Sequence, residues 1–279
     1  MGTPTSRLKK LSNWIDERTG VTHLWRGALD EPIRGGARWA YVFGSALAFL
    51  FALQLITGML LSIYYVPSAD HAHASVAFIQ KVVRGGALFR GLHAYGASAM
   101  IVLLVAHISQ TFLYGAYKQN RELVWLVGGL LLLLILAFAF TGYLLPWDQE
   151  AYFATKVGVS IAGEVPVVGP AQRKIMLGGS DLTSLTLSRF FMVHVLLLPL
   201  LLGLLIVVHV YLFRRAGPAG PTHNRNDRRV DRFFPKQLLK DSIAALIIFV
   251  ALLALAKFFP PRLGPEADPS SGFLARPPW

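Results

Sequence analysis

The 279-residue sequence has no cysteine and few charged residues. Without a thiol, the chain itself cannot form a disulfide, a thiolate zinc site, an iron–sulfur cluster or a thioether bond to a prosthetic group. Only 15% of the residues are charged while 54% are hydrophobic, and a soluble domain with that balance would be hard to keep in solution. The composition therefore indicates a membrane protein.

Five apolar runs are candidates for membrane spans. Four of them carry no charge and cover residues 39–69, 91–117, 123–147 and 190–213. A fifth, at 242–256, reaches spanning length if Lys240 and Lys257 extend toward the interface. Because a bilayer core of roughly 30 Å needs about 20 helical residues, we predict five transmembrane helices.

The positive charge is distributed unevenly along the chain. The net charge is +12, and 17 of the 27 Lys and Arg residues lie in the N-terminal tail and in the loops after the second and fourth spans. Five spans place these segments on one side, so the positive-inside rule makes the N-terminus cytoplasmic. The basic tract RNDRRVDR at 225–232 then suits an anionic lipid surface better than nucleic acid, which we do not expect as a partner.

The chain divides into five segments. They are an amphipathic cytoplasmic segment (1–38), a four-helix core (39–213), a basic cytoplasmic loop (214–237), a fifth transmembrane helix (238–259) and an outer tail (260–279). The long connection between the third and fourth spans mixes apolar and polar residues, which predicts short helices at the outer surface. The predicted fold is all-α and integral to the membrane: a four-helix bundle, a fifth transmembrane helix and these surface helices.

Four histidines interrupt the apolar spans. His93 and His107 lie fourteen residues apart in the second span, and His194 and His209 lie fifteen apart in the fourth. On an α-helix these spacings fall about 40° short of four turns and about 60° beyond them, so the two histidines of each span share a broad face. They are separated by about 21 Å in the second span and about 22 Å in the fourth. Because the two spans run in the same direction, we expect His93 at the depth of His194 and His107 at the depth of His209.

Two facing imidazoles at each of two depths are typical of a helical bundle that holds haem iron. A zinc or di-iron site would need more ligands or carboxylates, and these two helices offer none nearby. We therefore predict two haems stacked across the membrane, which would carry electrons through a layer that otherwise insulates.

Small and basic residues fit the same hypothesis. Glycines in the first and third spans repeat the fourteen-residue spacing and would let a flat macrocycle approach; they are Gly44, Gly58, Gly128 and Gly142. Arg90 and Arg189 precede the outer histidines by three and five residues, where an arginine can bind a haem propionate. Helix packing for the glycines and interfacial anchoring for the arginines are the alternatives.

Several motifs in order resemble one known family. They are FRGLHAYGAS, HISQTFLYGAYKQNRELVW, TGYLLPWDQEAYFATKV, VPVVG and SRFFMVHVLLLP. Together they are similar to cytochrome b of the quinol–cytochrome c or plastocyanin oxidoreductase complexes, over nearly the whole chain. The fifteen-residue histidine spacing and the LPWDQ and YFATKV segments resemble the split, chloroplast-like form and its bacterial relatives.

The resemblance implies a mechanism. Quinol, either menaquinol or ubiquinol, would be oxidised near the outer surface of a bacterial cytoplasmic membrane, with one electron going to a Rieske iron–sulfur protein. The other electron would cross two non-covalent haem b groups and reduce quinone near the inner surface. His93 and His194 would bind the outer haem iron, and His107 and His209 the inner one.

The resemblance also implies quinone sites and partners. Part of the quinol-oxidation pocket would come from Tyr143, Pro146, Trp147, Phe153 and Ala154. The quinone-reduction site would lie by Arg214, Lys240 and Asp241, with plain interfacial charge as the alternative for the last two. The family further implies a cytochrome c-type subunit, a dimeric complex, and a C-terminal cytochrome b subunit or remainder of the chain that completes the oxidation site.

Three positions depart from the family pattern. Val42 stands where the chloroplast-like form has the cysteine that tethers an extra haem, so we expect that haem to be absent. Gln110 replaces an arginine that often follows the inner histidine of the second span. Pro278 replaces the glutamate of a Pro-Glu-Trp-Tyr loop to which the family assigns a role in proton release.

Two other functional classes are alternatives. A di-haem membrane anchor of a dehydrogenase or hydrogenase would also carry helical histidines, but should lack PWDQ and the long outer connection. A transporter that uses histidines as a proton relay would purify without a Soret absorption band.

Overall fold

The structure, a computed structural model, describes residues 4–22, 27, 29–219 and 229–271. Pro278 therefore lies outside the described residues. Within them, five helices are long and apolar enough to cross a membrane, and they confirm the predicted spans. Their bounds are Trp39–Ser62, Gly86–Leu113, Glu122–Leu144, Ser184–Ala216 and Phe233–Phe258.

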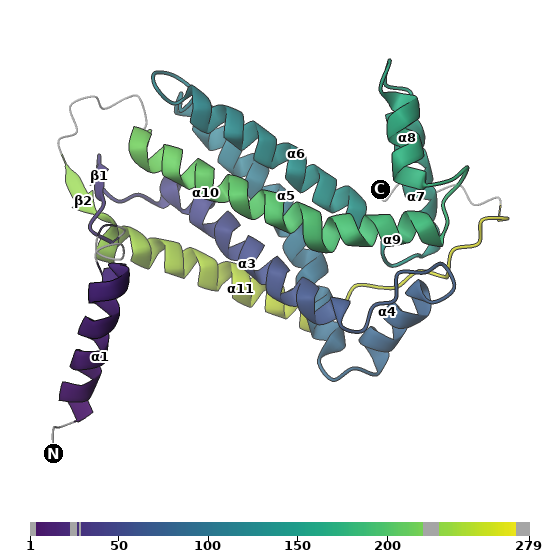
Figure 1. The fold of residues 1–279 in the computed structure, drawn as a ribbon, viewed down its shortest axis with the longest axis horizontal. Coiled ribbons are helices and arrows are strands. Elements are labelled where there is room, and N and C mark those ends of the chain that lie inside the picture. Colours follow the sequence, from purple (N-terminus) through teal and green to yellow (C-terminus); the bar gives the residue numbers. More distant parts are fainter. Residues whose placement is uncertain (1–3, 23–26, 28, 220–228, 272–279) are drawn as a thin grey trace.

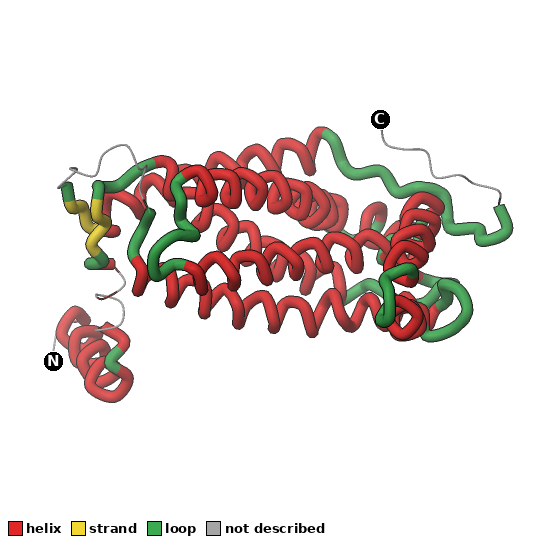
Figure 2. Tube along the Cα trace, turned by 90° about the horizontal axis from the view of Figure 1, so that it is seen from above, coloured by secondary structure: helices red, strands yellow, loops and turns green. Residues whose placement is uncertain are grey.

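The spans form a bundle of roughly parallel helices (Figures 1 and 2). The first span is a 3-10 turn (Trp39–Tyr41) followed by α3 (Val42–Ser62), and the next two are α5 (Gly86–Leu113) and α6 (Glu122–Leu144). The fourth joins α9 (Ser184–Met192) to α10 (Leu198–Ala216) through a π-helical turn at Val193–Leu197. The last is α11 (Leu238–Phe258), which follows the segment Phe233–Gln237.

The bundle has two layers. Helices α3, α5 and α11 pack against one another, and α6 packs along α10, whereas α5 and α6 make few contacts. A glycine lets α11 approach α5 closely, because a Cβ on Gly91 would lie 2.7 Å from the Cβ of Ala256. His93 and His107 are on α5 in the first layer, and His194 and His209 belong to the fourth span in the second. The histidines therefore face each other across a sparsely packed division.

Short elements gather at the two ends of the bundle (Figures 1 and 2). One end carries α1 (Pro4–Thr19) and a two-stranded antiparallel sheet of β1 (Pro32–Arg34) and β2 (Val230–Arg232). The other carries the predicted surface helices α7 (Gln149–Gly163) and α8 (Gly169–Leu177). It also carries α4 (Ala72–Lys81), which the sequence analysis did not anticipate. We call these the inner and the outer end, following the charge asymmetry.

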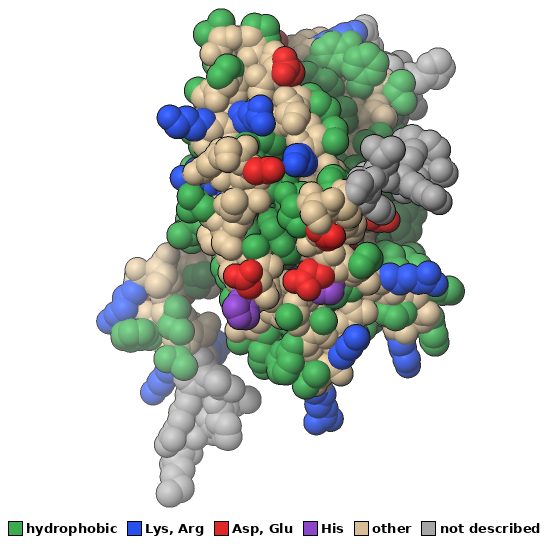
Figure 3. Space-filling model, turned by 90° about the vertical axis from the view of Figure 1, so that its right-hand side faces the viewer, with side chains coloured by type: hydrophobic (Ala, Val, Ile, Leu, Met, Phe, Trp, Pro, Cys, Tyr) green, Lys and Arg blue, Asp and Glu red, His purple; other side chains and the backbone are tan. Residues whose placement is uncertain are grey.

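A segment of the tail, residues 260–271, runs across the outer end and is called the outer strap here. His73 donates a hydrogen bond to the Gly264 carbonyl at 2.8 Å. The backbone N–H of Gln149 donates to the Pro265 carbonyl at 2.9 Å, and the Asp268 N–H donates to Oε1 of Gln149 at 2.6 Å. The strap thus ties α4 to the PWDQ segment at the start of α7. Figure 3 views this end, where charged side chains are spread over a largely uncharged surface.

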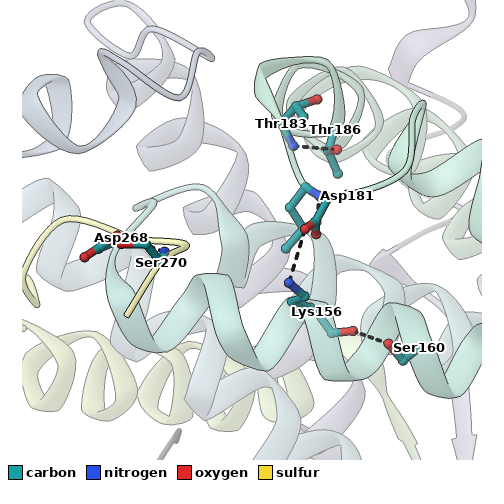
Figure 4. A network of polar contacts seen from close by, with 8 residues as sticks. Lys156, Ser160, Asp181, Thr183, Thr186, Asp268 and Ser270 are labelled. Atoms are coloured by element: carbon teal, nitrogen blue, oxygen red, sulfur yellow. Dashed lines mark hydrogen bonds and ion pairs between the residues drawn. The ribbon is translucent and has the colours of Figure 1, made fainter. Parts of the chain in front are cut away.

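Local polar contacts fix the surface helices. Asp148 caps α7 by accepting a hydrogen bond from the Ala151 N–H at 3.0 Å, and Thr183 and Thr186 form a capping box at the start of α9. Lys156 of α7 lies 3.2 Å from the carboxylate of Asp181 in the loop before α9 (Figure 4). This ion pair links α7 to the loop that leads into the fourth span.

Acid should weaken this link. Partial burial raises the pKa of Asp181, but hydrogen bonds from the Leu182 N–H and the Lys156 ammonium outweigh it and hold the pKa below its ordinary value of 3.8. A carboxylate with a lowered pKa stabilises the fold above its unfolded pKa, and this contribution is lost as the pH falls through the folded pKa.

We expect Asp181→Asn to remove that dependence. Both side chains are about half exposed, so the loss should be under about 1 kcal/mol. Melting curves of the purified complex between neutral pH and pH values below 4 would measure it, with Glu164→Asn as a control on the same connection. An acid-induced loss that is the same in Asp181→Asn and in the unmodified protein would contradict the assignment.

Candidate functional site

The outer histidines form a close pair. The ring centroids of His93 and His194 lie 6.3 Å apart, with the ring planes at 71°. Two imidazoles that share one metal atom at the usual distance of about 2 Å place their centroids about 6 Å apart. No cluster of three or more metal-binding side chains occurs in the described part of the chain. The pair therefore fits a metal whose remaining ligands come from a macrocycle, as in haem.

Two threonines fix the protonation of these rings. The Nδ1 atoms of His93 and His194 lie 2.9 and 3.1 Å from the Oγ1 atoms of Thr57 and Thr141. Each hydroxyl donates its own proton to a backbone carbonyl one turn earlier, at 2.7 and 2.8 Å. The hydroxyl oxygens therefore accept the proton on Nδ1, which leaves the Nε2 lone pair of each ring available for a metal.

The inner pair is held differently. His107 and His209 are close enough for their rings to interact electrostatically, which agrees with the predicted shared depth. The Nδ1 atoms of His107 and His209 are both buried, and neither has a hydrogen-bond partner among the described residues. A backbone carbonyl faces one ring at each level, that of Val124 at His209 and that of Phe138 at His194. Within the described residues, no threonine takes the place that Thr57 and Thr141 have at the outer pair.

Each predicted glycine lies against one histidine ring. A Cβ on Gly58 would lie 3.2 Å from His93, and one on Gly142 only 2.6 Å from His194. At the inner level the corresponding distances are 3.4 Å from Gly128 to His209 and 3.9 Å from Gly44 to His107. Substituting the outer glycines would push a side chain into the imidazole. The space beside the rings thus explains the fourteen-residue spacing better than helix packing does.

The π-helical turn explains the unequal histidine spacing. The N–H of Leu198 donates to the carbonyl of Val193, five residues earlier, so this turn holds one residue more than an α-helical turn. Pro199 follows immediately and has no N–H to donate to the previous turn. With one residue absorbed, fifteen residues between His194 and His209 rotate the helix about as far as the fourteen between His93 and His107.

The two arginines predicted to bind propionates make protein contacts. Arg90 donates to Oε1 of Gln80 at 2.6 Å and to the Pro261 carbonyl of the outer strap at 2.7 Å. Arg189 donates to the Ile175 carbonyl at 2.7 Å. The contacts of Arg90 with the strap and of Arg189 with α8 were not predicted from the sequence. Arg90 uses only some of its five N–H donors in these contacts, so a role toward a carboxylate stays a proposal.

The residues predicted for quinol oxidation are only partly together. Trp147 is buried with a positive φ of 51°, and its ring makes an edge contact with Tyr152, which in turn contacts Phe153. Pro146 and Ala154 are half-buried next to them. Tyr143 is 52% exposed and lies outside this cluster.

The inner end contains a small cavity whose mainly apolar lining includes a few charged side chains. Its volume is about 110 Å³, and both Arg214 and Asp241 line it. Asp241 is buried and accepts hydrogen bonds of 2.8 Å from Ser45 and from Gln237. Arg214 pairs with Glu31 at 3.4 Å. Lys240 is not among the lining residues; its ammonium lies 5.9 Å from the centre of the Trp39 ring.

Sequence reasoning missed several of these residues. Thr57 and Thr141 could have been found from the sequence, because each directly precedes an outer glycine in a Thr-Gly pair. No sequence pattern points to Glu31, Ser45 and Gln237, because these residues come from distant segments and meet only at the cavity.

Comparisons with known proteins agree with this geometry. The family model described as cytochrome b/b6/petB matches residues 29–217. The chain belongs to the cytochrome b/b6 family. This confirms the resemblance drawn from the motifs and leaves no support for the transporter or dehydrogenase-anchor alternatives. As a cytochrome b, the chain is an electron-transfer subunit of an oxidoreductase complex.

Some relatives match this chain over nearly their whole length, and others are longer than the part that it matches. The menaquinol:cytochrome c reductase cytochrome b subunit of Geobacillus thermodenitrificans is 41% identical over 77% of this chain and 99% of its own length. The cytochrome bc complex cytochrome b subunit of Chlorobaculum thiosulfatiphilum is 43% identical over 95% of this chain, which covers 63% of that protein. A chain of a hyperthermophilic respiratory Complex III matches with a TM-score of 0.83 at 33% identity, over 93% of this chain and 71% of that one.

Filling the space beside His194 should cost this cytochrome b a haem. Gly142→Val places two methyl groups where the ring lies, so we expect the haem content to fall by about half if each histidine pair holds one group. Gly129→Val is the matched control, because nothing lies within 4 Å of a Cβ at that position of the same helix. A pyridine haemochrome assay measures haem per chain, and an equal loss in both variants would show a general packing defect instead.

Proposed function

We propose that this cytochrome b holds two non-covalent haem b groups, one at each histidine pair, and moves electrons between quinone sites on the two sides of a bacterial cytoplasmic membrane. The observation that carries the proposal is the outer pair: two imidazoles at haem-ligand spacing whose Nε2 atoms are left unprotonated by threonine contacts. His93 and His194 would bind one iron, and His107 and His209 the other.

The haem supplies the one-electron chemistry when it is bound. The protein supplies position and environment. The glycines keep side chains away from the ring edges, the threonines orient the outer imidazoles, and the apolar spans exclude water from the path. The two pairs are separated by about 21 Å along one helix, so one pair would lie near each side of the membrane and exchange electrons there.

Sidedness follows from the charges. With the His107 end in the cytoplasm, the basic N-terminal tail and the loop before α11 meet the anionic inner leaflet. Helix α1 runs crosswise to the spans (Figure 1) and exposes Leu11, Trp14 and Ile15, which suits a helix lying on that surface.

Quinol oxidation belongs to the outer end in this proposal. The Trp147 and Phe153 cluster, with Pro146 and Ala154, would form one wall of the pocket, and a Rieske protein and a cytochrome c-type subunit would take the electrons from it. A C-terminal cytochrome b portion would supply further residues. The relatives named menaquinol:cytochrome c reductase favour menaquinol over ubiquinol as the substrate.

Quinone reduction belongs to the cavity at the inner end. Reducing a quinone consumes protons as well as electrons, and Asp241 is a carboxyl held between two hydrogen-bond donors at the cavity wall. Asp241 would pass a proton to a quinone oxygen, and Arg214, held by Glu31, would favour the reduced form electrostatically.

Single histidine substitutions test the two-haem assignment. We expect His107→Ala or His209→Ala to remove one b-type component and spare the other, and His93→Ala or His194→Ala to do the reverse, because each variant loses one axial ligand. Potentiometric titration of dithionite-minus-ferricyanide spectra of the purified complex resolves the components. A single component in the unmodified complex would rule out the two-site model.

A carboxyl substitution tests the inner site. Asp241→Asn keeps the size and one of the two acceptor oxygens but cannot donate the proton, so we expect quinone reduction to slow by about tenfold or more, within the usual range for loss of a general acid. Both haem components should remain. Stopped-flow reoxidation of the inner component measures the step, with Asp30→Asn, an exposed acid paired with Arg232, as the control. Unchanged reoxidation in Asp241→Asn would remove this residue from the proton path.

A further inference from the structure

Gln54 is a polar side chain inside the apolar helix α3. Its Nε2 atom is buried and has no hydrogen-bond partner among the described residues. The atom lies against the backbone of Gly96 in α5, in the place that a side chain on that residue would occupy. A buried amide donor without an acceptor is costly, so such a group calls for a specific reason.

The amide lies close to one histidine pair and far from the other. Gln54 precedes Gly58, the glycine that contacts the His93 ring, by one helical turn, or about 6 Å. It is ten residues, about 15 Å, from Gly44 at the inner level. Gly96 follows His93 by three residues. The amide therefore lies one turn inward from the outer pair, between the two levels.

Gln54 also shares a helix face with the residues that serve the outer pair. Positions three and four residues apart lie on one side of a helix, and Thr57 and Gly58 stand at these spacings from Gln54. Thr57 is hydrogen-bonded to His93. The glutamine is thus on the side of α3 that faces α5 and the His93 ring, and Gly96 provides the space for it.

We infer that Gln54 is a positioning residue that sets the reduction potential of the outer haem, through amide N–H groups directed at the electron-rich macrocycle. This rests on the proposed function, which places a haem at His93 and His194. The added electron makes the reduced haem more negative, and N–H dipoles stabilise it in a dry interior. Gln54 accordingly raises the potential of the outer haem and leaves the inner haem unchanged.

The test is a redox titration of the purified complex carrying Gln54→Met, which keeps the length of the side chain but removes the amide. The midpoint potential of the outer component should fall. The expected fall corresponds to a threefold to tenfold change in its one-electron equilibrium constant, and a tenfold change equals 59 mV. The midpoint of the inner component should not move. The His107→Ala and His209→Ala complexes identify which component is which.

Two further variants serve as a second measurement and as a control. Gly96→Ala displaces the amide without removing it and should shift the outer midpoint alone, which serves as a second measurement if Gln54→Met does not assemble. Gln110→Leu makes a similar polar-to-apolar change beside the inner pair and should leave the outer midpoint in place. Two haem components with an unmoved outer midpoint, or with equal shifts of both, would overturn the inference. Fewer than two components in the unmodified complex would instead overturn the proposed function.

Discussion

A neutral imidazole in a membrane span needs a partner, and this requirement organises the whole bundle. Four histidines lie inside helices that are otherwise apolar, and hydrocarbon offers their nitrogens nothing. The members of each pair meet across the division between the two layers. The glycines of α3 and α6 leave room beside the rings, and the threonines occupy Nδ1 at the outer level.

The two ends of the molecule are built from segments that lie far apart in the sequence. At the outer end, the strap binds α4 through His73 and the start of α7 through Gln149. At the inner end, the strands β1 and β2 bring the N-terminal segment beside the loop before α11. That pairing places Glu31 next to Arg214 and closes the cavity around Asp241. The apolar bundle thus supplies depth and orientation, while the polar ends supply sites for exchange with other molecules.

Much of this arrangement could be predicted, for a physical reason. The lipid restricts spanning segments to apolar helices, so the number of spans and the pairing of His93 with His194 follow from counting residues. The inner cavity could not be predicted, because Glu31, Ser45 and Gln237 come together only through tertiary contacts. The partners of Arg90 were hidden for the same reason, since the strap that meets it is 171 residues further along the chain. Helix α4 has no long apolar run and was missed for lack of a signal.

The π-helical turn at Val193–Leu197 allows the number of residues between the two histidines to change without moving the rings. Because that turn stores one residue beside His194, two chains can differ by one position in this span and still present both imidazoles to the same neighbours. Elsewhere in the span, the same change would turn His209 by about 100° toward lipid. An alignment of this helix should therefore place a one-residue insertion at the wide turn, where it leaves both imidazoles beside the same neighbours.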